Sequence, residues 1–205
     1  MNTDYHLPRR IFEWIRRIRN RCGYNIHSPF AFNWVTGVVY CDEAYYAYEP
    51  LAAERDQMDG LFSEKDDCLL FRVANHQEAN DILYVGQHSA RPEAYLRAAK
   101  KRAKFSVSQE LPSLADALRE HDMVVIEAPF AERISPEDPI FSLESRPRES
   151  GVIVCHGIHH NAAARERWQA LCNAQAVTIT FDLYRFGIAF LRPKLNRQHY
   201  RINYF

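Results

Sequence analysis

The sequence lacks the features that most directly assign a function. Its five cysteines form no CxxC pair, so neither a disulfide framework nor a zinc ribbon is expected. No apolar run approaches the roughly 20 residues that a membrane-spanning helix requires. The opening residues, MNTDYHLPRR, lack the apolar core of a secretory signal, and GxSxG and P-loop motifs are absent. We therefore expect a cytoplasmic protein with no membrane partner.

Net charge is also lacking. The 26 lysines and arginines balance 26 aspartates and glutamates, so no overall attraction to nucleic acid is expected. The charges do gather in blocks, which are basic over residues 1–30, acidic over 42–67 and basic over 183–205. Such blocks pair within one molecule or with a partner. We favour pairing within the molecule.

What is present suits one folded protein of moderate size. The chain has 205 residues, of which 47% are hydrophobic and 25% charged, as in ordinary globular proteins. Helical patterns fill the first part of the chain, and strand-like runs begin near Asp81. The division expected is a helical extension over 1–78 and a Rossmann-like domain over 79–205, together forming one compact unit.

Near the N-terminus, apolar residues recur at helical spacing among arginines. Ile11, Trp14, Ile15, Ile18 and Cys22 predict an amphipathic basic helix that ends near residue 23. Such a helix can lie on a membrane surface. We favour the alternative, in which its apolar stripe packs on the domain and its arginines face solvent or the acidic block.

Two further helices are indicated before the strands begin. Ser28 and Pro29 form a helix-start signature, with Ser28 as the N-cap and Pro29 in the first helical position. The stretch 65–74 also has a helical pattern.

Strands and helices alternate in the second part of the chain. Strand-like runs occupy 81–85, 104–108, 122–128, 151–155, 176–182 and 184–192, and helical segments occupy about 90–100, 112–120, 139–149 and 161–173. This alternation predicts a parallel sheet with right-handed crossovers. The last two runs are almost contiguous, which favours an antiparallel hairpin. The tail RQHYRINYF is expected to pack on the domain or on a neighbouring subunit.

Several segments carry a family resemblance. GYNIHSPFAF, GVIVCHGIHH, DLYRFGIAFLR and QHYRINYF, together with the strand order, resemble bacterial class I S-adenosylmethionine-dependent methyltransferases that have a helical N-terminal extension. The resemblance covers nearly the whole chain. It implies an α/β Rossmann-like sheet that ends in a β-hairpin, S-adenosylmethionine as cofactor, and a small molecule or protein as methyl acceptor.

The chain departs from this family at the cofactor site. The family's first strand ends in acid–x–Gly–x–Gly, where the acid holds the methionine ammonium and the glycines admit the cofactor. Tyr84 stands at the acid position, Gly86 is kept, and a bulky stretch from Gln87 to Arg91 replaces the second glycine. Glu110, after the second strand, is the candidate for the ribose hydroxyls, although an acid there is also an ordinary turn residue.

A second departure concerns the adenine. Only LPSLADALREH separates Glu110 from Asp122, which is room for one helix of about three turns. The family's third strand, at the sheet edge, is therefore expected to be missing, and the adenine pocket loses a wall.

The candidate catalytic residues are Glu127, His156 and His159. Catechol-type relatives carry an Asp at the position of Glu127, where it binds Mg²⁺ and approaches the acceptor hydroxyl, so Glu127 is a candidate for both cofactor binding and catalysis. His156 and His159, with His160, follow a strand, where open α/β folds bind ligands. They are interpreted as a general base, as a zinc site with Glu127, or as solvated loop residues. We expect no metal, because related proteins have acids where His156 and Gly157 stand.

Two functions follow. The first is a methyltransferase-like protein with a degenerate cofactor site, kept as a scaffold, as an oligomer subunit such as a homodimer, or for a different small-molecule ligand. The second is an active methyltransferase. The accumulated departures favour the first, with S-adenosylmethionine binding in doubt.

Overall fold

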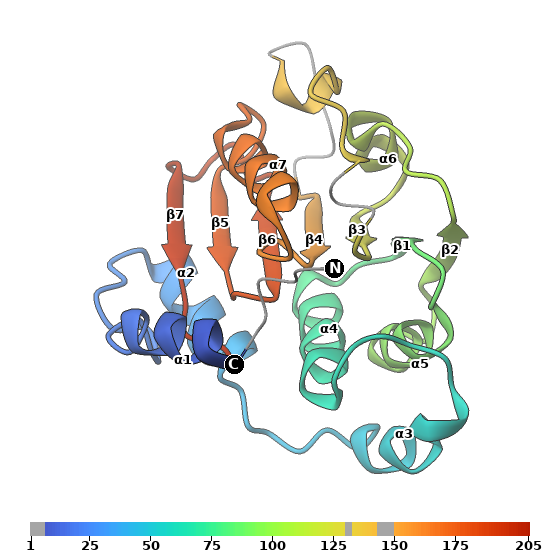
Figure 1. Ribbon diagram of the computed structural model, residues 1–205. Helices are drawn as coiled ribbons and strands as arrows, with labels where there is room; N and C mark the ends of the chain where they lie inside the picture. Colours follow the sequence, from blue (N-terminus) through green and yellow to red (C-terminus); the bar gives the residue numbers. More distant parts are fainter. Residues whose placement is uncertain (1–6, 130–132, 143–149) are drawn as a thin grey trace.

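The computed structural model describes residues 7–129, 133–142 and 150–205 (Figure 1). Before the sheet lie α1 (Leu7–Arg16), α2 (Pro29–Trp34), the π-helix η1 (Val35–Val39), α3 (Tyr48–Glu54), the 3-10 helix η2 (Arg55–Gln57) and α4 (Glu64–Gln77). Then follow β1 (Asp81–Val85), α5 (Ala90–Ala99), β2 (Lys104–Ser108), α6 (Leu114–Glu120), β3 (Met123–Ile126), η4 (Pro139–Phe141), β4 (Val152–His156), α7 (Ala162–Asn173), β5 (Ile179–Asp182), β6 (Phe186–Phe190) and β7 (Gln198–Arg201).

The strands form one seven-stranded sheet in the order β2-β1-β3-β4-β6-β5-β7. The first four of these are parallel, β6 is antiparallel to both β4 and β5, and β7 is parallel to β5. From β1 the chain turns toward β2 and then crosses back to β3, so the strand order reverses between β1 and β3. Open α/β sheets bind ligands at such a reversal, beyond the carboxyl ends of the strands.

Helices cover both faces of the sheet, because the parallel strands are apolar on both sides. One face is packed by α2, η1 and α4, with Trp34 stacked on Phe181 at 4.2 Å between ring centroids. The other face is packed by α6 and α7 through Leu118 and Leu171. The result is a three-layer arrangement, helices–sheet–helices, with the carboxyl ends of the parallel strands at one end of the sheet.

Local capping explains where two helices begin. The Ser28 hydroxyl accepts a hydrogen bond from the backbone amide of Ala31, with Pro29 in the first turn, as the sequence predicts. Ser63 caps α4 in the same way through the amide of Asp66.

Most of the predicted order of strands and helices is confirmed. β1 and β2 have the predicted bounds, β5 and β6 form the predicted antiparallel hairpin, and among the described residues no strand lies beyond β2. The tail forms an additional strand, β7, that was not predicted. Of the helix expected over 139–149, residues 139–141 form a single 3-10 turn and 143–149 lie outside the described residues.

The prediction for the N-terminal helix was wrong in two respects. The helix ends at Arg16, not near residue 23, and it buries none of its residues. Its apolar stripe does not pack on the domain. Other helices already cover both faces of the sheet, and α1 lies near the C-terminus, beyond the end of β7 (Figure 1). The Trp14 carbonyl oxygen accepts a hydrogen bond from the Asn203 side chain, and Arg17, which follows α1, donates to the Ile202 carbonyl oxygen.

The charge blocks pair within the molecule only in part. Arg185 of the C-terminal basic block lies 3.2 Å from Asp66 of the acidic block. The N-terminal Arg17 pairs instead with Asp182 on the sheet, at 2.8 Å.

Candidate functional site

The turn after β1 encloses the carboxylate of Glu127. Glu127 directly follows β3, the neighbouring strand, and its side chain is buried. Its Oε2 atom accepts hydrogen bonds from the backbone amides of Gln87 at 3.0 Å and His88 at 3.1 Å. It also accepts one from the Tyr84 hydroxyl at 2.9 Å. Amides of a strand-to-helix turn are the usual anion ligands of this fold class, and here they hold a carboxylate of the chain itself.

Gly86 is required by the same carboxylate. A Cβ atom at residue 86 would contact Glu127 Oε2 and would lie 2.7 Å from both Glu127 Cβ and Tyr84 Cε1, closer than side chains can approach. Glu127 and Tyr84 thus fill the space that a glycine in this turn leaves open. Burial, and then the charge of Glu127, raise the pKa of Tyr84 well above its usual range, so its hydroxyl stays protonated and donates.

A segment from the N-terminal part of the chain covers this turn. The carbonyl oxygen of Asp59 accepts a hydrogen bond from the Arg91 amide at 2.8 Å, and the Asp59 carboxylate lies 2.9 Å from His88 Nδ1. Gly60 packs so closely on Arg91 that a Cβ there would lie 2.6 Å from its Nε. Arg91 in turn pairs with the buried Asp67 of α4 at 3.3 Å. His88 and Arg91 therefore hold a cover over the turn.

Glu110 lies after β2, as predicted, but its side chain is exposed. Its backbone is fixed by Ser108, whose hydroxyl lies 3.2 Å from the Glu110 amide and 2.6 Å from the Glu110 carbonyl. This placement fits both interpretations of Glu110, as an ordinary turn residue and as a ligand of the ribose hydroxyls. Gly86, Gln87 and Glu110 line none of the cavities described below.

The end of β4 is open. A cavity of about 450 Å³ lies there, lined by Arg10, Leu61, Ser63, Asp66, Ala128, Pro129, His156, His160 and Arg185. His156 is the last residue of β4, and its ring centroid lies 4.8 Å from that of Phe62 and 5.0 Å from that of Phe186, which also contact each other. We call this the β4-end cavity.

His156 is neutral in this setting. Burial, followed by the charges of Arg185 and His160, lowers its pKa to about 4. Its Nδ1 atom is buried and has no hydrogen-bond partner among the described residues. A buried polar atom of this kind ordinarily has a partner, and this one has almost no accessible surface, so other atoms of His156 line the cavity.

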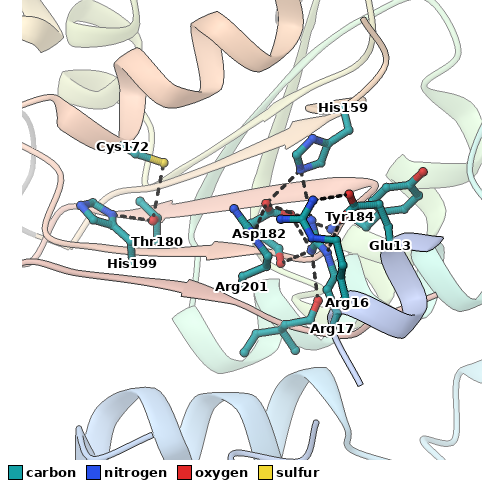
Figure 2. Close-up of polar contacts among 11 residues, drawn as sticks. Glu13, Arg16, Arg17, His159, Cys172, Thr180, Asp182, Tyr184, His199 and Arg201 are labelled. Atoms are coloured by element: carbon teal, nitrogen blue, oxygen red, sulfur yellow. Dashed lines mark hydrogen bonds and ion pairs between the residues drawn. The ribbon is translucent and has the colours of Figure 1, made fainter. Parts of the chain in front are cut away.

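His159 belongs to a different cluster (Figure 2). Its Nε2 atom lies 2.9 Å from Asp182 Oδ2 and 3.3 Å from an Nη of Arg17. Burial alone would raise the pKa of Asp182, but the bond to His159 and the charge of Arg17 hold it below its usual range. This cluster borders a second cavity of about 480 Å³ that is lined by residues of α7 and of the strands β5 and β7.

The three predicted catalytic residues have different partners. Glu127 and His156 lie beside each other at the ends of the paired strands β3 and β4, but the Glu127 carboxylate is bound by the turn after β1, whereas His156 lines the β4-end cavity and His159 contacts Asp182. Within the described residues no group of three or more His, Cys, Asp or Glu side chains is placed to hold a metal ion. The closure of the turn by Glu127 was not foreseen. The available signals were the bulk of Tyr84 beside Gly86 and an acid at the end of the adjacent strand.

Comparison with known proteins supports the fold. No protein-family model and no curated protein sequence matches the chain. Among solved structures, a candidate caffeoyl-CoA O-methyltransferase from Staphylococcus aureus aligns with TM-score 0.50 and 8% identity, over 72% of this chain and 93% of that one. A Geobacter sulfurreducens methyltransferase aligns with TM-score 0.49 and 10% identity, over 80% and 97%. The O-methyltransferase TomG from Streptomyces achromogenes, solved with S-adenosylmethionine, gives 0.46 and 18%, over 73% and 91%.

The first of these alignments spans most of both chains. The fold is therefore that of class I S-adenosylmethionine-dependent methyltransferases, as the resemblance implied.

Proposed function

We propose that this protein keeps the methyltransferase fold with a closed cofactor site, does not transfer methyl groups at a useful rate, and binds a different small molecule in the β4-end cavity. The observation that carries the proposal is the bonding of Glu127 to the amides of Gln87 and His88 and to the Tyr84 hydroxyl.

The physical reason is competition for the same donors. A cofactor carboxylate or ribose that approached this turn would have to displace the buried Glu127 carboxylate. Leaving a buried charged group without partners costs about 1–3 kcal/mol or more. The cover formed by Asp59 and Gly60 would also have to move, which breaks the bonds to His88 and Arg91.

The sheet edge supports the same proposal. Among the described residues β2 is one of the two edge strands, and Glu110 after it is exposed. An adenosine placed there would meet solvent on the side where the family has further loops. Little binding energy then remains to displace Glu127.

Calorimetry and thermal unfolding with S-adenosylmethionine test the proposal. A ligand at 100 times its Kd adds about 2.7 kcal/mol to the unfolding free energy, which is easily seen as a rise in Tm. We expect no heat of binding and no rise at millimolar cofactor. TomG, which was crystallised with the cofactor, is the positive control. Micromolar binding by the wild-type chain would refute the closed site.

Restoring the family's acid should not reopen the site. Tyr84→Asp would place a carboxylate beside Glu127, from which the Tyr84 hydroxyl now lies 2.9 Å away, and would not rebuild the adenine wall. We expect no measurable S-adenosylmethionine binding by this variant in calorimetry, provided that circular dichroism shows it folded. Detectable affinity would show that Tyr84 alone closes the site.

The second candidate is an active methyltransferase, which His156 favours. The residue lies at the end of β4, a central strand, and lines the β4-end cavity. Its pKa of about 4 makes it a weak base at neutral pH, where efficient general bases have a pKa closer to 7. Transfer of a labelled methyl group to any acceptor by the wild type, lost in His156→Gln, would establish this candidate.

A further inference from the structure

Helix α1 is docked with its polar side inward. Leu7, Ile11, Phe12, Trp14, Ile15 and the following Ile18 have between 40% and 66% of their surfaces exposed. These six account for over half of the eleven large hydrophobic side chains that are exposed among the described residues. An amphipathic helix of a globular protein normally turns this face to the core.

Arg17, which directly follows α1, is what holds the helix in this orientation. It is 1% exposed, and one Nη lies 2.8 Å from Asp182 Oδ1 and 3.3 Å from the Ile202 carbonyl oxygen. Its Nε lies 3.5 Å from Glu13 of the helix itself. Figure 2 shows Glu13 and Arg17 meeting beside Asp182 and His159. Because the polar side is bound to the sheet, the apolar side faces away from the molecule.

Arginines flank the outward face. Arg9, Arg16 and Arg19 are exposed, whereas Arg10, also exposed, lines the β4-end cavity on the side of the domain. The only acid within the described part of this region, Glu13, lies 2.8 Å from Arg16 and also contacts Arg17. The apolar face is therefore bordered by positive charge.

The apolar face with arginines beside it could be covered by a second copy of the chain or by a lipid surface, and the charge decides between them. A second copy of the chain, packed face to face about a two-fold axis, would bring the arginines of both helices together. An anionic lipid surface accepts both parts of the pattern, since aromatic and aliphatic side chains enter the boundary between headgroups and acyl chains while arginines meet the phosphates.

We propose that α1 seats this protein on the surface of an anionic lipid bilayer. The contact is peripheral, because no helix in the described part of the chain is long and apolar enough to cross a membrane. The sequence alone led us to expect no membrane partner, because the predicted helix is short and the chain has no second membrane signal.

Co-sedimentation of the full chain with lipid vesicles tests the proposal. We expect binding to vesicles of equal parts phosphatidylcholine and phosphatidylglycerol, little binding to pure phosphatidylcholine, and a loss of affinity as salt is raised. Absence of binding to the anionic vesicles at low salt would overturn it.

Variants separate the two parts of the surface. The triple variant Ile11→Ser, Phe12→Ser, Ile15→Ser should lose vesicle binding while its thermal unfolding stays unchanged, because all three side chains are exposed. Tyr46→Ser with Val107→Ser, which are exposed apolar residues outside α1, is the matched control and should bind as wild type.

Arg16→Gln with Arg19→Gln should weaken binding about 25-fold, at about fivefold for each charge near an anionic surface. Lys101→Gln with Arg102→Gln, in the loop before β2, is its control and should leave affinity unchanged. If the wild type ignores vesicles but sediments as a dimer that the triple serine variant dissociates, the face belongs to a second copy and the membrane proposal fails.

Discussion

The turn after β1 and the end of β4 both lie at the carboxyl ends of the parallel strands. The turn is filled by the Glu127 side chain, whereas the end of β4 borders a cavity. In the turn, every donor near Glu127 Oε2 is satisfied and the Asp59–Gly60 segment covers it. At the end of β4, His156 keeps an unmet Nδ1 atom beside a cavity of about 450 Å³. A fold can thus close one of its ligand positions with a single side chain from the neighbouring strand while leaving the next position accessible.

Glu127→Ala should have the largest effect on this contrast. It removes the acceptor of the Gln87 and His88 amides, while the Tyr84 hydroxyl keeps the His88 carbonyl oxygen, at 3.1 Å, as an acceptor. Each buried donor left unsatisfied costs about 1–3 kcal/mol, and allowing for water that enters the space we expect the unfolding free energy to fall by about 2–3 kcal/mol in urea denaturation. Glu110→Ala, at the exposed candidate acid, should change it by less than about 0.5 kcal/mol. A loss below about 1 kcal/mol for Glu127→Ala would mean that the turn is held by other contacts.

Gly86→Ala should be next in size. The added Cβ collides with Glu127 and Tyr84, and overpacking of this kind costs about 1–3 kcal/mol. The control is Gly37→Ala in η1, where a Cβ meets nothing within 4 Å. That substitution should be neutral or slightly stabilising by thermal unfolding, since alanine is the better helix former. Equal effects at the two glycines would contradict a filled turn.

A pH titration should separate the two regions by sign. His156 has a folded pKa of about 4, below the unfolded value of about 6.5. The unfolded chain therefore binds more protons between these values, and the unfolding free energy falls as the pH is lowered through this range.

Asp67, which holds Arg91 under the covered turn, behaves in the opposite way. Burial raises its folded pKa to about 7 against the opposing charges of Arg91 and Arg55, whereas the unfolded value is about 3.9. Its contribution to the unfolding free energy rises as the pH is lowered from about 7 to about 4.

Each contribution changes by at most about 1.4 kcal/mol per pH unit, and in the wild type the two offset each other. Relative to wild type, His156→Gln should gain stability on acidification and Asp67→Asn should lose it, as measured by urea denaturation from pH 7 to pH 4. Parallel profiles for all three proteins would show that neither group is shifted.

The sequence predicted the parts of the fold that depend on local pattern. DILYV and KFSVS are short and rich in β-branched or apolar residues, and they form β1 and β2 at the predicted bounds. Ser28 with Pro29 marks a helix start that needs no tertiary information. The absence of a strand beyond β2 among the described residues followed from the family resemblance and the short linker before β3, which has room for one helix.

The parts that escaped prediction depend on contacts between distant residues. β7 carries glutamine, histidine, tyrosine and arginine, and only its pairing with β5 makes it a strand. The Glu127–Tyr84 bond joins two strands across 43 residues. The outward face of α1 was missed because the buried partner of Arg17, Asp182, could not be recognised from the sequence.

That ion pair also sets an order of events during synthesis. Arg17 cannot form its ion pair until Asp182, 165 residues later in the chain, has been synthesised. At ribosomal rates of about 5–20 residues per second the delay is roughly 10–30 seconds. During that interval the residues of α1 have already been synthesised, but the strand that carries Asp182 has not, so the helix has no docking partner on the sheet. A nascent chain of this protein can therefore meet a lipid surface or a chaperone before its own domain exists to orient the helix.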